Sequence, residues 1–220
     1  PIKMNYVYGL VSKVSKVKQN ILTYPAYTPV WPDTINRYQS VLRQAEKKDI
    51  LLSYPFESME PFLRLIKEAA WDEQVISIKI TIYRLASHAK LVDYLCAAAE
   101  NGKEVTVLIE LRARFDEQNN IDWSERLEEA GCNVTYGFDF YKVHSKVCLI
   151  TMMGKNGIHY ITQVGTGNYN ENTAKMYTDL SLITANRQIG QDAAEFFKNM
   201  AIANLHGEYN HLLVAPVSLK

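Results

Sequence analysis

The chain has 220 residues, and its 24 Lys and Arg balance its 24 Asp and Glu, so the formal net charge is zero. A chain of this length forms one large domain, or a domain with an extension, and can bury roughly 70% of the surface that its unfolded form exposes. The zero net charge gives no global electrostatic reason to expect a nucleic acid or an anionic membrane as a partner. Any anion site must therefore be local, built from Lys and Arg that folding brings together.

Neither a membrane span nor a secreted, disulfide-linked fold is expected. No apolar run approaches the length of a membrane span, and no secretory signal opens the chain. Cys96, Cys132 and Cys148 are widely spaced, fit no zinc pattern and cannot all pair within one chain. We therefore expect reduced thiols in the cytoplasm. Because the chain starts at Pro1 rather than Met, we also expect a fragment of a longer protein.

Residues 1–48 are expected to form a connector from a preceding domain. Three prolines in residues 24–32 interrupt any helix or central strand, which favours an extended segment packed through its aromatic residues. Asp33 or Thr34 can then cap a short helix. Its apolar residues at helical spacing would be Ile35, Tyr38, Leu42 and Ala45.

Residues 49–220 are expected to form the main domain, which begins with alternating strands and helices. Ser58 can cap a helix, and residues 75–83 alternate as a strand with Ile76, Ile78, Ile80 and Ile82 on one face. Helices are expected at about residues 89–101 and 121–130, each ended by a glycine, with strands at 105–109 and around Val134. Short connections between strands and helices predict right-handed βαβ units and a parallel sheet.

The pattern changes after residue 140. Residues 141–150 read as a strand, and Gly154 to Gly157 separates two strand-like runs as a hairpin turn does. A strand is expected at 177–184, a helix around 191–204 and a short strand at 212–214. The predicted fold class is α/β, with a mixed β-sheet flanked by helices.

The strand predicted at residues 141–150 carries a row of basic side chains. Lys142, His144 and Lys146 alternate along it, so they are expected to share one face, with roughly 7 Å between neighbours. Two ammonium groups beside one imidazole disfavour the imidazolium form. A neutral imidazole among cations suits a nucleophile that attacks an anionic phosphoryl group. The alternative is a half-exposed strand whose three polar side chains are simply solvated.

Arginines follow two of the predicted strands at equivalent positions. Arg84 comes just after residues 75–83, and Arg112 and Arg114 come just after residues 105–109. Ligands of open α/β sheets bind beyond the carboxyl ends of the strands, so these guanidinium groups are expected at one rim. Arg binds phosphate oxygens through two parallel hydrogen bonds. The sequence therefore predicts an anion site there.

Two further segments are less specific. The closely spaced glycines of residues 165–170 allow backbone N–H groups to converge on an anion, although such clusters are also ordinary turns. Asp116 and Glu117 could hold Mg²⁺ or pair with the neighbouring arginines, and we favour pairing.

Five blocks of the sequence resemble one family. Residues 80–84 (ITIYR), 110–117 (ELRARFDE), 142–146 (KVHSK), 165–170 (GTGNYN) and 173–179 (TAKMYTD) look like signature blocks of bacterial polyphosphate kinase. The resemblance is to the long type of that enzyme, which has a phospholipase-D-like catalytic half. It runs in order from about Tyr24 to the end of the chain and covers the first of two C-terminal catalytic domains.

The resemblance implies a reversible transfer of the terminal phosphate of ATP to inorganic polyphosphate through a phosphohistidine at His144. The resemblance implies that Tyr177 contacts ATP and that Arg84 and Arg114 lie at positions associated with Mg²⁺. To these we add Lys146 as a second catalytic residue, and Asn168, Arg84 and Arg114 as residues that bind ATP or phosphate. A guanidinium group is cationic, so a backbone carbonyl, a phosphate or a water would have to make the bond to Mg²⁺.

The expected partners are ATP or ADP and polyphosphate, with Mg²⁺ as cofactor and no nucleic acid. The full-length enzyme is expected to be a cytoplasmic homo-oligomer with peripheral membrane association. The resemblance covers only the first of the family's two catalytic domains, so half of a two-sided site is expected to be missing. We therefore expect the chain alone to be weakly active or inactive.

Two other functions remain open from the sequence. A phosphodiesterase of the phospholipase D class would use the same histidine chemistry, but Thr151 stands where that class places an aspartate after His-x-Lys. A non-catalytic module would use the same basic residues only to bind a polyanion.

Overall fold

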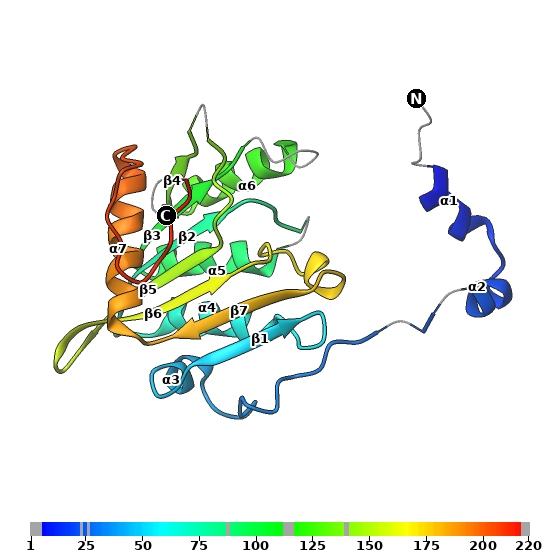
Figure 1. Cartoon of the computed structure of the whole chain (residues 1–220), viewed down its shortest axis with the longest axis horizontal. Coiled ribbons are helices and arrows are strands. Elements are labelled where there is room, and N and C mark those ends of the chain that lie inside the picture. Colours follow the sequence, from blue (N-terminus) through cyan, green and yellow to red (C-terminus); the bar gives the residue numbers. More distant parts are fainter. Residues whose placement is uncertain are drawn as a thin grey trace.

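The computed structural model describes residues 6–22, 24–25, 27–86, 89–111, 117–138 and 141–216. Its centre is a seven-stranded sheet with the strand order β1-β7-β6-β5-β2-β3-β4 (Figure 1). β2, β3 and β4 are parallel to one another, whereas every other neighbouring pair is antiparallel. The predicted α/β fold with a mixed sheet is confirmed. The strands are β1 (Ile50–Tyr54), β2 (Val75–Ile82), β3 (Glu104–Ile109), β4 (Asn133–Tyr136), β5 (Val147–Gly154), β6 (Gly157–Gly165) and β7 (Asp179–Thr184).

Helices cover both faces of the sheet (Figure 1). One face packs in the main core against α3 (Val41–Ala45), α4 (Glu60–Trp71), α5 (Lys90–Glu100) and α6 (Glu117–Glu129). The other face packs against α7 (Arg187–Ala201), where Phe196 and Phe197 contact the cluster that holds Val147 and Leu149. Successive strand residues point to opposite faces, so β5 serves both cores.

β2 shows where alternation works and where it fails. Ile78, Ile80 and Ile82 are at most 1% exposed, as the period-two pattern predicts. Ile76 is 42% exposed, so its placement with the other three was wrong. The register against β5 shifts between Val75 and Ser77, and an extra residue at such a bulge leaves the alternation.

The other predicted boundaries were tested element by element. Gly102 and Gly131 have φ values of 80° and 90° and end α5 and α6, as predicted. Gly154 pairs with Gly157 across the turn between β5 and β6, which confirms the hairpin. The helix predicted around residue 191 begins earlier, at Arg187, because Asn186 caps it by accepting from two backbone N–H groups.

One predicted helix is shorter than expected, and one predicted strand is absent from the described residues. Residues 33–39 form turns, and α3 begins only at Val41, after Ser40 accepts a hydrogen bond from the backbone N–H of Arg43. Residues 212–214 are not a strand and instead pack along α7. Both misassigned segments contain apolar residues that pack into a core although their backbone forms no regular helix or strand.

The start of the chain divides into two parts. α1 (Tyr6–Lys13) and α2 (Lys16–Leu22) lie apart from the sheet in Figure 1. Ile35, Val41 and Leu42 belong to the main core. The predicted connector therefore contributes to that core, and its division from the domain at residue 48 stays a prediction. No helix within the described residues is long and apolar enough to cross a membrane.

Candidate functional site

Four strand ends meet at one rim of the sheet. β5 is antiparallel to β2, so the start of β5 lies beside the end of β2. Val147 at the start of β5 pairs with Val164 near the end of β6, and Gly165 pairs with Ser181 near the start of β7. The sequence blocks that follow or precede these ends are therefore neighbours. This rim, called the site rim below, carries Arg84, His144, Lys146 and residues 165–168.

The segment that carries His144 is not a strand. β5 begins only at Val147, so the strand prediction for residues 141–146 was wrong. Two of its backbone groups form hydrogen bonds with side chains instead of with a neighbouring strand. The Val143 N–H donates to Glu110 Oε2 (2.8 Å), and the Ser145 carbonyl accepts from Thr81 Oγ1 (2.8 Å).

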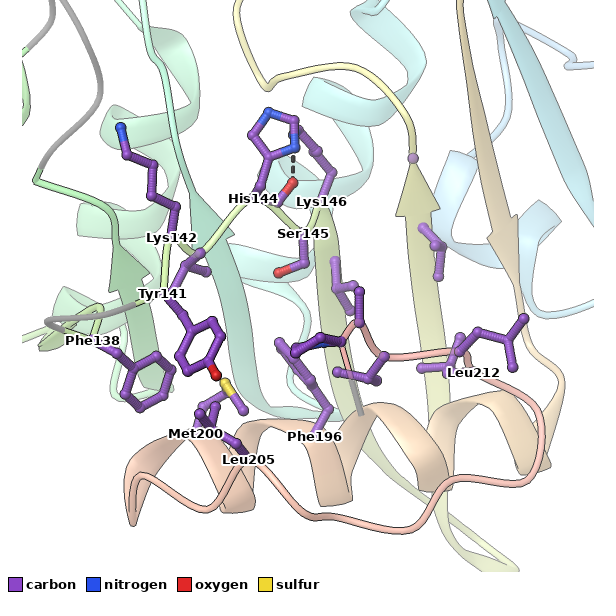
Figure 2. Close-up of a pocket in the computed structure, with 18 residues that line it drawn as sticks. Phe138, Tyr141, Lys142, His144, Ser145, Lys146, Phe196, Met200, Leu205 and Leu212 are labelled. Carbon is purple, nitrogen blue, oxygen red and sulfur yellow. Dashed lines mark hydrogen bonds between the residues drawn. The ribbon is translucent and has the colours of Figure 1, made fainter. Parts of the chain in front are cut away.

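The three basic residues of this segment consequently have different surroundings. Lys146 is only 5% exposed, whereas Lys142 and His144 are exposed. The Lys146 ammonium donates to the carbonyl of His144 (Figure 2). Figure 2 also shows the Lys142 side chain diverging from Lys146. The expected row of three equivalent side chains on one face was wrong, because that expectation depended on a regular strand.

Tyr83 lies at the centre of the basic cluster. Its ring meets the imidazole of His144 edge-on, with 4.8 Å between ring centroids. The Arg84 guanidinium carbon lies 5.6 Å from the Tyr83 centroid, and Lys146 Nζ lies 5.5 Å from it. Cations are attracted to the faces of aromatic rings at such distances. The structure thus brings together three of the predicted site residues around an aromatic ring that sequence reasoning did not single out.

The surroundings of this cluster lower the pKa values of its two titrating bases, His144 and Lys146. The pKa of His144 is lowered from its ordinary value by partial burial first and then by the charges of Lys146, Arg84 and Lys142. Burial lowers the pKa of Lys146 to about 8, and the carboxylate of Asp179 opposes that change. At neutral pH, the site therefore combines an uncharged imidazole with a cationic, poorly solvated ammonium group.

The glycine-containing loop at residues 165–168 closes against the same cluster. The Gly165 N–H donates to the carbonyl of Lys146 (2.9 Å), and Thr166 Oγ1 donates to Asp179 Oδ1 (2.7 Å). A Cβ at Gly167 would lie 2.6 Å from Asp179 Oδ2, so this close approach requires glycine. Asn168 Oδ1 is buried and has no hydrogen-bond partner within the described part of the chain. The loop is therefore fixed beside Lys146, and it contains one buried acceptor without a hydrogen-bond partner in the described residues.

The sequence analysis did not predict Asp179 as a site residue, although Asp179 is the last residue of the family block at 173–179. Its signal is weak because an isolated Asp before a strand is common. Tyr177, two residues earlier, is 61% exposed and lies at the same rim, between the 3₁₀ turn Thr173–Lys175 and β7. Arg112, Arg114 and Asp116 lie outside the described residues, so their predicted positions stay predictions.

A cavity of about 540 Å³ lies beside the His144 segment, between that segment, α7 and the tail at residues 205–216 (Figure 2). Most of its lining is apolar, and Phe138, Phe196 and Met200 contribute to it. Ser145 and the imidazole of His144 point in opposite directions from the segment in Figure 2. Lys142, His144 and Lys146 also line this cavity, so the segment contributes to both the basic cluster and the apolar cavity.

A Mg²⁺ site made of side chains does not emerge from the described residues. Within them, no group of three or more His, Cys, Asp and Glu could hold a metal ion. The groups around Tyr83 are cationic or neutral nitrogen donors, whereas Mg²⁺ prefers oxygen ligands. The Arg84 guanidinium group does not fit the role of a direct ligand.

The fold defines the class of protein. The structure of Nuc from Salmonella typhimurium, described as a phospholipase D family member, superposes with a TM-score of 0.53 at 17% identity. That match covers 70% of this chain and 92% of the other. The chain therefore has a phospholipase-D-like fold.

Sequence comparisons assign the chain to one family within this fold class. Residues 40–205 match the family model described as polyphosphate kinase C-terminal domain 1, and the chain belongs to this family. It is 43% identical over 220 residues to polyphosphate kinase of Staphylococcus haemolyticus, covering 100% of this chain and 30% of that protein. The crystal structure of polyphosphate kinase from Porphyromonas gingivalis superposes with a TM-score of 0.75 at 32% identity, covering 87% of this chain and 33% of the other. The chain thus spans about 30% of the length of the curated relative.

Proposed function

We propose that this domain belongs to an enzyme that reversibly transfers the terminal phosphate of ATP to inorganic polyphosphate, with His144 as the nucleophile. The observation that carries the proposal is the cluster around Tyr83, where the imidazole of His144 lies among Arg84 and Lys146. The family membership supports the substrates, ATP or ADP and polyphosphate, because relatives are named polyphosphate kinase.

Two displacement steps account for the transfer. A neutral nitrogen of His144 attacks the terminal phosphorus of ATP, an N–P bond forms, and the bond from that phosphorus to the bridging oxygen breaks, which releases ADP. A terminal oxygen of polyphosphate then attacks the same phosphorus, and the N–P bond breaks. The low pKa of His144 keeps a lone pair available for the first step.

The surrounding groups stabilise negative charge on the transferred phosphoryl group. Lys146 and Arg84 lie around the same Tyr83 ring as His144 and lower its pKa, which supports the proposal that they contact oxygens on a phosphorus bound there. Asn168, Tyr177 and Arg114 are proposed to bind the remaining phosphates or the nucleotide. Lys146 is buried, so its charge is screened less by solvent than that of Lys142.

Mg²⁺ is proposed as the cofactor on the strength of the family alone, near Arg84 and Arg114. Since guanidinium groups do not ligate cations, a backbone carbonyl, a phosphate or a water would make any bond there. We assign no step of the transfer to the ion.

The whole enzyme is proposed to be a cytoplasmic homo-oligomer with peripheral membrane association and without a nucleic acid partner. The domain alone is proposed to be a poor enzyme, because the resemblance covers only the first of the family's two catalytic domains and the other half of the site is expected in the second. Phosphoryl transfer requires donor and acceptor in line, and misplacement by about 1 Å can cost 10²-fold in rate.

The test is polyphosphate synthesis by the full-length enzyme from radiolabelled ATP. His144→Ala should abolish synthesis, whereas His206→Ala, which changes an exposed histidine, should retain it. Substantial synthesis by His144→Ala would contradict the proposal. Hydrolysis of bis-p-nitrophenyl phosphate, with no transfer from ATP, would indicate the phosphodiesterase instead, and binding without either reaction would indicate a polyanion-binding module.

A further inference from the structure

The main chain on both sides of His144 is held by side chains from other strands. Before it, the Val143 N–H donates to Glu110, directly after β3. After it, the Ser145 carbonyl accepts from Thr81, in β2. Glu110 and Thr81 are 3% and 1% exposed, so both bonds are shielded from water.

Thr81 continues the sheet at the point where regular pairing stops. The last registered pair between β2 and β5 is Ile80 with Cys148. One residue further on, Thr81 Oγ1 accepts from the Val147 N–H (3.1 Å) and donates to the Ser145 carbonyl (2.8 Å). One hydroxyl thus bridges the two residues on either side of Lys146.

The consequence is a rigid tripeptide. The carbonyl of His144 accepts from the Lys146 ammonium, that of Ser145 from Thr81, and that of Lys146 from the Gly165 N–H. Only the middle bond comes from a neutral side chain outside the tripeptide. Thr81 is therefore the residue whose removal would loosen the backbone of the proposed nucleophile without removing any charge from the site.

We propose that Thr81 is a positioning residue, whose hydroxyl fixes the backbone of residues 145–147 and thereby the direction of the His144 imidazole and the Lys146 ammonium. This inference rests on the proposed role of His144 as nucleophile. Thr81 does not contact substrate. Its effect is geometric, because in-line attack tolerates little displacement of the nucleophile.

Two substitutions separate the hydroxyl from the packing of this buried side chain. Thr81→Val keeps the shape and removes the hydroxyl, which leaves the Ser145 carbonyl and the Val147 N–H unpaired. Thr81→Ser keeps the hydroxyl and removes a methyl group. If Thr81 positions His144, Thr81→Val is the more damaging change for the reaction. If Thr81 only fills space, Thr81→Ser is the more damaging one.

The measurement is the single-turnover rate of phosphohistidine formation from ATP in the full-length enzyme, expressed per folded molecule. Thr81→Val should lower this rate by about 10- to 100-fold while the Kd of ATP changes by about 2-fold or less. Thr81→Ser should restore the rate to within about 3-fold of wild type. In a histidine NMR titration, the pKa of His144 should rise toward its ordinary value in Thr81→Val, because the neighbouring cations are no longer held in place.

Equal rates for wild type and Thr81→Val, or a slower rate for Thr81→Ser than for Thr81→Val, would overturn the inference. If Thr81→Val does not fold, Thr81→Cys replaces it, since a thiol is a weak donor of similar size, and the same order against Thr81→Ser is expected. These outcomes require that wild type carries the phosphoryl group on His144. Wild type labelled elsewhere would contradict the proposed function, whereas wild type labelled at His144 with an unaffected Thr81→Val would contradict only the role of Thr81.

Discussion

Basic side chains at the two opposite rims of the sheet differ in their partners and in the direction of their pKa shifts. At the rim opposite the site, Arg43 of α3 lies beside the start of β2, and its guanidinium contacts Glu46 (3.0 Å) and Asp72. His159 of β6 contacts the same Glu46 (3.1 Å). The pKa of Arg43 is raised, chiefly by the hydrogen bond to Glu46. At the site rim, the pKa values of Lys146 and His144 are lowered, chiefly by burial.

The difference separates charges that hold the fold from charges available to a ligand. Arg43 links α3 to the turn before β2 through its ion pair with Asp72 and its hydrogen bond to Gln74, which join elements distant in sequence. Lys146 is buried in a setting that disfavours its charge, which costs stability. A bound phosphate would supply the negative charge that Lys146 needs. We therefore propose that the site rim accepts an anion, which would compensate the buried charge of Lys146.

Among the charged side chains compared at the two rims, Lys146 has the largest expected effect, and this effect is on the reaction. Lys146→Met should slow polyphosphate synthesis by the full-length enzyme by about 10²–10³-fold, because a buried charged donor is lost. Lys142→Met should slow it much less, because Lys142 is exposed and its charge is screened. Steady-state assays of both variants would decide this, and a Lys142→Met enzyme slower than Lys146→Met would break the distinction between the two lysines.

The second effect is a change in the pH profile. Lys146 is protonated below its pKa of about 8, so kcat/KM should fall as the pH rises through that value. The acid limb should lie below 6.5, because the pKa of His144 is lowered and its neutral form persists there. Lys146→Arg stays charged at every accessible pH and should lose the basic limb. An unchanged basic limb in Lys146→Arg would assign that ionisation to another group.

The smallest expected effect is on the free energy of unfolding, where substitutions at the two rims should have opposite signs. Between pH 8 and 10.5 the unfolded chain keeps a proton on Lys146 that the folded chain has lost, so this residue contributes a free energy of unfolding that rises with pH. At pH 7 its charge is a cost, and Lys146→Met should stabilise the fold by about 1–2 kcal/mol after loss of its hydrogen bond to His144.

Arg43→Met is the matched change at the other rim, and it should lower the free energy of unfolding by about 1 kcal/mol. Urea denaturation of both variants at pH 7 measures these values. Destabilisation of similar size in both would mean that the two rims do not differ in this respect.

Local patterns in the sequence were sufficient for the fold and part of the candidate site. The isoleucines of β2 and the glycines after α5 and α6 carry short-range signals, which predicted a strand and two helix ends. Arg84 and His144 could be predicted to lie near each other because strand ends converge at one rim. Such inferences need only the periodicity of the elements and their order.

The rest depends on contacts between residues far apart in the chain. Residues 141–146 have the composition of a strand, but their backbone is bonded to Glu110 and Thr81, which are 33 and 64 residues away from their partners. The burial of Lys146 follows from that geometry and not from its neighbours in sequence. Asp179 gains its role only because β7 returns beside β6 and brings it to Thr166. No local pattern carries this information.

The most direct test of the central claim locates the phosphoryl group on the protein. Full-length enzyme is quenched at high pH after brief reaction with ATP, digested, and analysed by mass spectrometry, with His206→Ala and His144→Ala enzymes treated in parallel. The account predicts an acid-labile, base-stable phosphoryl group on His144 in wild type and in His206→Ala, and none at this position in His144→Ala. A catalytically competent enzyme whose phosphoryl group is found on another residue, with His144 unmodified, would contradict it.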